Sequence, residues 1–401
     1  MNNNTQSAPK VMIVSGEASG DMHTARLVRA FKHQNPDAVF YGIGGPAMRD
    51  AGVRLIRDVG ELSTFGIFEV IKHLPQIIGI FFEALRSISN ERPDVVVLVD
   101  YPDFNLRLAR AIRWRYGDRP LIMYYIAPQV WIWRKWRAKL LAKLSDRLAV
   151  VLPFEKNLFE AFGARAHFVG HPSLEDDTEK VIDRPSDVDS TADIGRRNIA
   201  LLPGSRHGEL HNYMPPIIEA VKLLAESNDK DWRFFIIKAP TLEFSDFAPY
   251  LDGDTPDITI TEGPTRELLT SADFAVVGLG TATLEAALAG TPALLIGKVS
   301  PLTYKFSVRF LDMDLEYYSL VNFILKRLAY PELIQDNLTG PKIAQAIMDI
   351  TSNKRAIAAL VNAANEVRAK LEVEAENGIH GNTPSERAAS ILGEMVTESR
   401  E

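Results

Sequence analysis

The sequence contains no cysteine, so it can form no disulfide bond, no thiolate metal site and no cysteine nucleophile. It also lacks any run of the roughly 18 uncharged apolar residues that a membrane-spanning helix needs. Residues 1–10 are polar, and the apolar run Val11–Val14 is too short for a signal peptide. These absences predict a cytoplasmic protein that does not cross a bilayer.

Several common enzyme motifs are missing as well. There is no Gly-x-Gly-x-x-Gly, no Walker loop and no Gly-x-Ser-x-Gly, which argues against a nicotinamide-dependent oxidoreductase, a P-loop enzyme and an esterase. The eight histidines show no metal-ligand spacing. His207 and His211 stand four apart, but no acid-rich third ligand accompanies them. We therefore expect neither a metal ion nor a cofactor.

What is present is the composition of a soluble globular protein of two or three domains: 401 residues, 46% of them hydrophobic and 24% charged. The net charge of −7 argues against a nucleic-acid partner. The charge is uneven, because Phe104–Arg147 holds 11 Lys and Arg against two acidic residues. Such a patch favours an anionic partner, either a phosphorylated ligand or a lipid surface.

Short β-rich runs alternate with helical stretches along the chain, and this order predicts parallel sheets with right-handed crossovers. The fold class we expect is α/β, with two doubly wound parallel-sheet domains, residues 1–175 and 194–365, facing a cleft. The acidic stretch Glu175–Asp193 predicts the linker between them. We expect the helices of residues 366–401 to pack back on the first domain or on a partner subunit, so a homodimer is allowed. The expected strands are Lys10–Ser15, Ala38–Gly42, Asp94–Asp100, Leu121–Ile126, Leu148–Leu152 and Ala166–Val169, then Asn198–Leu202, Arg233–Lys238, Ile258–Thr261, Phe274–Val277 and Ala293–Ile296.

Two segments of the first half follow strands directly. Gly16–Asp21 is small and polar enough to bring backbone close to an anion, although a plain strand-to-helix turn explains it nearly as well. Asp100 falls where a strand leaves the sheet, which suits a general base. Asp103 or Asn105 could cap the following helix, and for Asp103 we favour that interpretation.

Two segments of the second half suit phosphate. In Leu202–Arg206, Gly204 permits close approach of the backbone to a ligand. Ser205 can donate one hydrogen bond to a phosphate, and Arg206 can donate two. In Gly280–Ala287, small residues at a helix start leave N–H groups free for a diphosphate. Glu285 could accept from ribose hydroxyls or simply favour the positive end of the helix.

The stretch Gly66–Arg86 predicts an amphipathic helix. Its apolar side chains fall within one broad face, which could pack on the core or lie on a bilayer. Trp131–Arg137, with Lys139 and Lys143, combines indoles and cations as a membrane interface does. The face comprises Ile67, Val70, Ile71, Leu74, Ile77, Ile78, Phe81, Phe82 and Leu85.

Taken together, the motifs resemble those of the lipid-A-disaccharide synthase family, in order from about Val11 to Ala346. The resemblance implies an inverting glycosyltransferase of the two-domain GT-B type. Such an enzyme joins UDP-2,3-diacylglucosamine to 2,3-diacylglucosamine 1-phosphate and releases UDP during lipopolysaccharide assembly in Gram-negative bacteria. The motifs are Ser15–Asp21, Asp100-x-Pro102-Asp103-Phe104-Asn105, Pro128–Arg134, Leu152–Glu155, Phe168–Pro172, Leu202–Arg206 and Gly280–Glu285.

The resemblance also implies roles for individual residues. Asp100 matches the base that deprotonates the acceptor 6-hydroxyl. Glu17 is our candidate for a second catalytic carboxylate, although the sequence leaves open whether Glu17 or Asp21 assists Asp100. The helix after Gly66 matches one that touches the inner membrane from the cytoplasmic side. Ser19, Gly20 and Asp21 fall on the acceptor side. The residues expected to bind the UDP-sugar donor are Gly204, Ser205, Arg206, Gly280, Thr281, Ala282, Thr283, Glu285, Asn322 and Gln335.

Two rival functions remain open. A UDP-N-acetylglucosamine 2-epimerase would share the UDP site but needs no lipid-facing helix. A two-lobed ligand-binding protein without enzymatic activity would leave Asp100 without a role.

Overall fold

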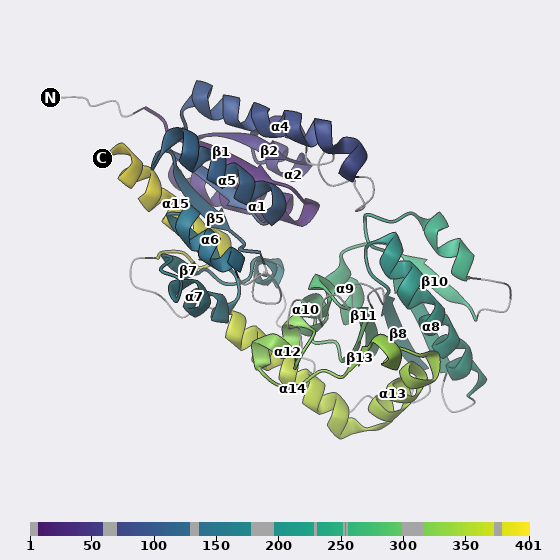
Figure 1. Cartoon of the computed structure of the whole chain (residues 1–401). Helices are drawn as coiled ribbons and strands as arrows, with labels where there is room; N and C mark the ends of the chain where they lie inside the picture. The colour runs from purple at the N-terminus through teal and green to yellow at the C-terminus, as the bar shows by residue number, and fades with distance from the viewer. Residues whose placement is uncertain are drawn as a thin grey trace. The chain divides into compact units, whose positions relative to one another are not determined.

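The computed structural model describes residues 7–58, 70–128, 136–177, 196–227, 231–251, 253, 256–298, 316–372 and 379–401. The chain divides into two compact units, one made of Met1–Asp176 with Leu371–Glu401 and the other of Asp177–Lys370 (Figure 1). Among the described residues, no helix has both the length and the apolar character to cross a membrane.

A seven-stranded parallel sheet forms the centre of the N-terminal unit. Its strand order, β3-β2-β1-β4-β5-β6-β7, places the first strand inside the sheet, as in doubly wound folds. The central strand β4 reads Val-Val-Val-Leu-Val and is buried on both faces, which explains its lack of alternation. The strands are β1 Lys10–Ser15, β2 Val39–Gly44, β3 Arg54–Asp58, β4 Val95–Val99, β5 Leu121–Tyr125, β6 Arg147–Val150 and β7 Ala166–Phe168.

Helices cover both faces of this sheet. One hydrophobic core joins Met12, Leu98 and Tyr124 of the strands to Ile80, Leu108 and Leu141 of α4, α5 and α6. The opposite face carries α1 and α15, which pack against each other. The helices are α1 Ala18–Gln34, α2 Pro46–Asp50, α4 Val70–Glu91, α5 Pro102–Tyr116, α6 Trp136–Leu144, α7 Pro153–Glu160, the 3-10 helix η1 Pro172–Asp177, and α15 Pro384–Arg400.

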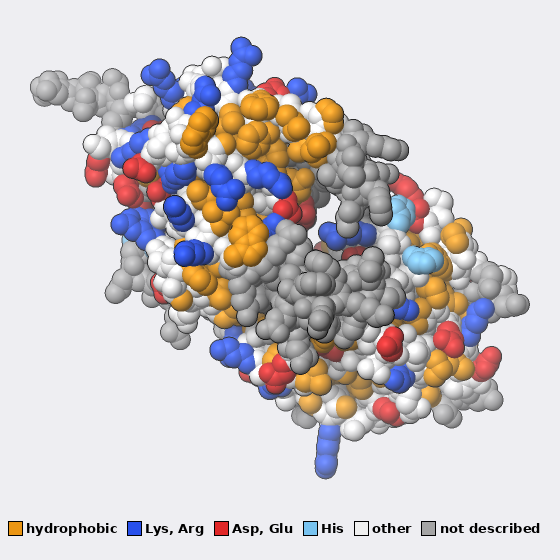
Figure 2. All heavy atoms as spheres, in the orientation of Figure 1, with side chains coloured by type: hydrophobic (Ala, Val, Ile, Leu, Met, Phe, Trp, Pro, Cys, Tyr) orange, Lys and Arg blue, Asp and Glu red, His pale blue; other side chains and the backbone are white. Residues whose placement is uncertain are grey.

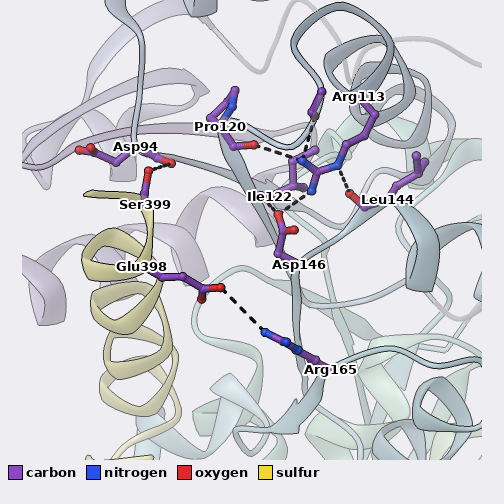
Figure 3. Close-up of polar contacts among 10 residues, drawn as sticks. Asp94, Arg113, Pro120, Ile122, Leu144, Asp146, Arg165, Glu398 and Ser399 are labelled. Carbon is purple, nitrogen blue, oxygen red and sulfur yellow. Dashed lines mark hydrogen bonds and ion pairs between the residues drawn. The ribbon is translucent and has the colours of Figure 1, made fainter. Parts of the chain in front are cut away.

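Helix α15 returns from the far end of the chain to this unit. Near its C-terminal end, the Ser399 hydroxyl donates to the Asp94 carbonyl at 3.0 Å and Glu398 pairs with Arg165 at 3.9 Å (Figure 3). Near its N-terminal end, the Ser385 amide and hydroxyl donate to the two carboxylate oxygens of Glu175, at 2.5 and 3.0 Å. The last helix therefore lies on the first unit of its own chain.

A six-stranded parallel sheet, in the order β10-β9-β8-β11-β12-β13, forms the C-terminal unit. Two edge strands, β3 and β13, were absent from the sequence prediction, because neither is fully buried and β3 carries three charges in five residues. The strands are β8 Arg196–Leu202, β9 Asp231–Ile237, β10 Ile258–Thr261, β11 Phe274–Gly278, β12 Ala293–Gly297 and β13 Glu332–Ile334. The helices are α8 His207–Glu226, η2 Phe244–Tyr250, α9 Thr265–Thr270, α10 Thr281–Leu288, α12 Leu320–Leu325, η3 Gln335–Asn337, α13 Gly340–Ser352 and α14 Lys354–Leu371.

Candidate active site

Two of the predicted segments lie side by side at the carboxyl edge of the first sheet. Strands β1 and β4 are paired, with Ser15 opposite Val99, so the chain leaves both strands at the same edge. Gly16 touches the Tyr101 ring so closely that a Cβ on Gly16 would lie 2.3 Å from it. Any larger residue at position 16 would push the two segments apart.

Asp100 is the perturbed carboxyl of this edge. Burial, followed by the negative charge of Glu17, raises the pKa of Asp100 from 3.8 to about 6, against a smaller lowering by a backbone hydrogen bond from Tyr101. The side chain therefore titrates close to neutrality and is ionised above about pH 6. A carboxylate of that kind is a stronger base than an ordinary surface aspartate.

Glu17 and Asp21, the two other acids of this edge, differ in what they contact. Glu17 is exposed at the N-terminal end of α1. Asp21 is 4% exposed, and its carboxylate accepts from the Gly45, Ala47 and Met48 amides at 2.7–3.1 Å. These contacts make Asp21 a cap for α2. Glu17 is the acid whose negative charge helps to raise the pKa of Asp100.

Ser19 and Gly20, which lie between these two acids, have different surroundings. Ser19 is exposed on the first turn of α1. Gly20 is buried, and a Cβ there would lie 2.5 Å from the Ser15 hydroxyl. Gly20 therefore lets α1 start directly against β1, and Ser19 is the residue whose side chain remains accessible.

The second sheet brings its two predicted phosphate segments together in the same way. Strands β8 and β11 are paired, with Leu202 opposite Val277, and the Leu202–Arg206 and Gly280–Glu285 segments follow them. Gly204 has φ +103°, and a Cβ there would lie 2.4 Å from Glu209 Oε2. The same Glu209 oxygen accepts from the Ser205 amide at 2.7 Å, and the Thr241 hydroxyl donates to the Ser205 carbonyl at 2.6 Å. The loop is therefore held from two sides, and the exposed Arg206 follows it as the N-cap residue of α8.

Gly280 begins the other segment, as the N-cap residue of α10, with φ +149°. A Cβ on Gly280 would meet no described atom within 4 Å, so the start of the helix is open. Thr281 is exposed there and Ala282 partly so, whereas Thr283 is buried with its hydroxyl on the Gly280 carbonyl at 2.8 Å. The open first turn presents backbone N–H groups, which favour an anion.

Glu285 on the next turn pairs with Arg266 at 3.2 Å, and both side chains are largely buried. Arg266 belongs to α9 and to none of the motifs, so the sequence alone gave no signal for it. The ion pair with Arg266 therefore orients the Glu285 carboxylate.

Asn322 and Gln335, the two weaker donor-side predictions, differ in accessibility. Asn322 is fully buried. Its amide nitrogen donates to the Tyr330 carbonyl and the Glu332 carboxylate, while its oxygen accepts from the Ala329 and Tyr330 amides. All four hydrogen bonds are internal, so Asn322 organises the turn between α12 and β13. Gln335 instead lines a surface cavity of about 280 Å³ together with Tyr318 and Glu332.

The predicted membrane helix is α4, and part of its apolar face is uncovered. Leu74, Ile78 and Phe82 are 48%, 45% and 63% exposed, while Ile77 and Phe81 pack partly against the core. Figure 2 shows hydrophobic side chains gathered over α4, with Lys and Arg side chains beside them. Two tryptophans add to the surface of this unit, Trp114 of α5 at 86% and Trp136 of α6 at 61% exposure. Ile67 and Gln129–Lys135 lie outside the described residues, as do the side chains of Val70 and Ile71.

Within the described ranges, no group of three or more His, Asp and Glu side chains is placed to hold a metal ion.

A known protein family matches this sequence over most of its length. The model of the family described as lipid-A-disaccharide synthetase matches residues 11–380. A lipid-A-disaccharide synthase from Geobacter sulfurreducens is 41% identical over 339 residues, which cover 84% of this chain and 86% of that protein. One from Trichlorobacter lovleyi is 36% identical and covers 97% and 98% of the two chains.

Solved structures resemble the fold at low sequence identity. The glycosyltransferase of kitacinnamycin superposes with a TM-score of 0.61 at 15% identity, covering 97% of this chain and all of that one. A UDP-GlcNAc 2-epimerase from Methanocaldococcus jannaschii, solved with UDP-GlcNAc and UDP, gives 0.58 at 13% identity, covering 96% and 99%. At these identities the likeness shows the two-sheet fold alone.

Proposed function

Because this chain belongs to the lipid-A-disaccharide synthase family, we propose that it is the GT-B glycosyltransferase that joins UDP-2,3-diacylglucosamine to 2,3-diacylglucosamine 1-phosphate. The products are the β-1,6-linked disaccharide 1-phosphate and UDP. In this proposal the N-terminal unit binds the acceptor sugar, and the C-terminal unit binds the nucleotide of the donor.

Asp100 is the general base in this proposal. Its carboxylate takes the proton of the acceptor 6-hydroxyl as that oxygen bonds to the anomeric carbon of the donor. The bond from that carbon to the UDP oxygen breaks at the same time, which inverts the configuration. The observation that carries the assignment is the partial burial of Asp100 beside Glu17, which raises the pKa of Asp100 to about 6.

The C-terminal unit supplies the positive potential for the leaving diphosphate. Arg206 is an exposed cation next to the Gly204–Ser205 backbone, and the open first turn of α10 offers N–H groups. Such donors stabilise charge that develops in the transition state. We propose that they suffice without a metal ion, so added chelator should leave turnover unchanged.

The experiment that tests the reaction is incubation with both lipid-linked sugars in detergent, followed by detection of disaccharide and UDP. Asp100→Asn should lose turnover by about 10²–10⁴-fold, the usual contribution of a general base. It should still bind UDP. Asp118→Asn, an exposed acid beyond the end of α5, is the matched control and should keep full activity. An epimerised UDP-sugar in place of disaccharide would contradict the proposal.

We propose in addition that the enzyme is cytoplasmic and binds the membrane surface through α4. The acyl chains keep both substrates in the bilayer, since each buried methylene contributes about 0.8 kcal/mol. Leu74, Ile78 and Phe82 are the exposed apolar side chains available for that contact.

The triple variant Leu74→Ser, Ile78→Ser, Phe82→Ser should lose binding to liposomes that contain anionic phospholipid. Leu223→Ser is the control, because Leu223 is 40% exposed but lies on α8 of the other unit. Unchanged liposome binding by the triple variant would refute a role for α4. The same preparations, analysed by size-exclusion chromatography with light scattering, test the homodimer that the sequence allows.

A further inference from the structure

The backbone at Asp100 and Tyr101 has a conformation that ordinary residues avoid. Their φ angles are +42° and +45°, so two consecutive non-glycine residues occupy the left-handed region. Each such residue costs about 1 kcal/mol or more and persists only where its surroundings hold it there. One of the two residues in this unfavourable conformation is Asp100, the proposed base.

Two buried side chains hold this conformation through a single atom, the carbonyl oxygen of Asp100. The Asn105 amide nitrogen donates to it at 2.9 Å, and the Tyr124 hydroxyl donates to it at 2.5 Å. Asn105 also donates to the Val99 carbonyl at 3.0 Å, which ties the end of β4 to the first turn of α5. Both Asn105 and Tyr124 have no exposed surface.

The Tyr124 hydroxyl can donate its hydrogen bond to the Asp100 carbonyl at any pH at which the enzyme works. Burial places the pKa of Tyr124 well above its ordinary value of 10, so its hydroxyl keeps its proton at every pH of interest. Tyr124 comes from β5, the strand next to β4, and Asn105 from α5. The carbonyl is therefore fixed from two separate elements.

The direction of the Asp100 side chain depends on that carbonyl. In a strand φ is near −120°, and the change to +42° turns Cβ about the N–Cα bond to a different side of the chain. If residue 100 relaxed to negative φ, its carboxylate would leave its place beside Glu17. A misplacement of about 1 Å can cost as much as 100-fold in rate.

From these contacts we propose that Asn105 and Tyr124 are positioning residues that aim the Asp100 carboxylate by clamping its carbonyl oxygen. The inference rests on the proposed function, since it requires Asp100 to be the base.

The test compares Tyr124→Phe and Asn105→Ser with Tyr116→Phe. Tyr116 is the matched control because its hydroxyl also donates to a backbone carbonyl, that of Leu85, at 3.0 Å, but at the other end of α5. Each clamp variant should lower kcat by about 10-fold to 100-fold. The KM for the UDP-sugar should stay within twofold of wild type, and Tyr116→Phe should keep wild-type kcat.

Two further readouts separate positioning from general damage. In single-turnover assays with Asp100→Asn as the background, Tyr124→Phe should cause no further loss, because there is no carboxylate left to aim. In the otherwise wild-type enzyme, Tyr124→Phe should move the acid limb of kcat/KM from about pH 6 to lower pH, as Asp100 leaves its buried place. If Asn105→Ser does not fold, Tyr124→Phe decides the question alone.

The possible failures are distinct. Wild-type kcat in Tyr124→Phe, or an equal further loss in the Asp100→Asn background, would overturn the clamp while leaving the base assignment intact. Wild-type turnover in Asp100→Asn would instead overturn the base assignment, and the clamp with it. Failure of the wild-type protein to form disaccharide would overturn the proposed function itself.

Discussion

The partly buried Asp100 carboxyl should make the enzyme less stable than it could be, and Asp100→Asn should reveal by how much. The pKa of Asp100 rises from 3.8 to about 6, or by about two units. At 1.36 kcal/mol per unit, ionising this group costs the folded state about 3 kcal/mol. The neutral amide of asparagine escapes that cost and tolerates the left-handed backbone at position 100.

Because ionisation of Asp100 destabilises the folded state, the difference in stability between wild type and Asp100→Asn depends on pH. Below about pH 3 the carboxyl is protonated in both folded and unfolded chains, so wild type and Asp100→Asn should be equally stable. As pH rises from about 4 to 6 the unfolded chain ionises first, and wild type loses stability relative to the variant. Above about pH 6 the difference should be constant.

Urea unfolding of both proteins at pH 4 and pH 8 measures the difference, with the transition of the N-terminal unit as the readout. Asp118→Asn, an exposed acid, should change the free energy of unfolding by less than about 0.5 kcal/mol at either pH. An Asp100→Asn protein less stable than wild type at pH 8, or a gain of equal size at pH 4, would refute the reasoning. A gain in stability together with loss of turnover would be the mark of a group held in place for chemistry.

Three further predictions concern other parts of the molecule. Glu17→Gln removes the like charge beside Asp100, so the acid limb of kcat/KM should move to lower pH; an unmoved limb would exclude the coupling. Gly204→Ala places a Cβ 2.4 Å from Glu209 Oε2 at φ +103°. The strain, about 1–3 kcal/mol, should weaken UDP binding about tenfold or more in calorimetry, whereas Gly208→Ala, with open space around its Cβ, should not. Glu175→Gln weakens both hydrogen bonds from Ser385, so amides at the start of α15 should exchange faster with deuterium; unchanged exchange would show that apolar packing alone holds the helix.

The sequence predicted the buried parts of the fold well, because burial leaves a pattern. Runs such as Val95–Val99 are apolar on both faces and can only be internal parallel strands. Strand β3, Arg54–Asp58, has no such pattern because an edge strand needs little apolar surface.

The sequence predicted candidate segments for the site but not the hydrogen-bond partners of each side chain in them. Asp21 and Asn322 are polar residues in two of these segments, yet most of their hydrogen bonds join them to backbone of the same unit. Asn105 has the position of a helix cap but donates backward, to the strand. Nothing in a linear sequence gives these partners, since they depend on which amides the fold leaves unpaired nearby. The same is true of Arg266, which pairs with Glu285 of the next helix, 19 residues further along the chain.

The return of α15 to the first sheet has a consequence for biosynthesis. The ribosome makes β1 to β7 early, then the whole of the C-terminal unit, and only afterwards the helix that covers one face of the early sheet. Until then the apolar residues that α1, β4 and β5 present to α15 remain uncovered. The nascent N-terminal unit therefore stays incomplete while the C-terminal unit is made, and its uncovered apolar surface is prone to aggregation during translation.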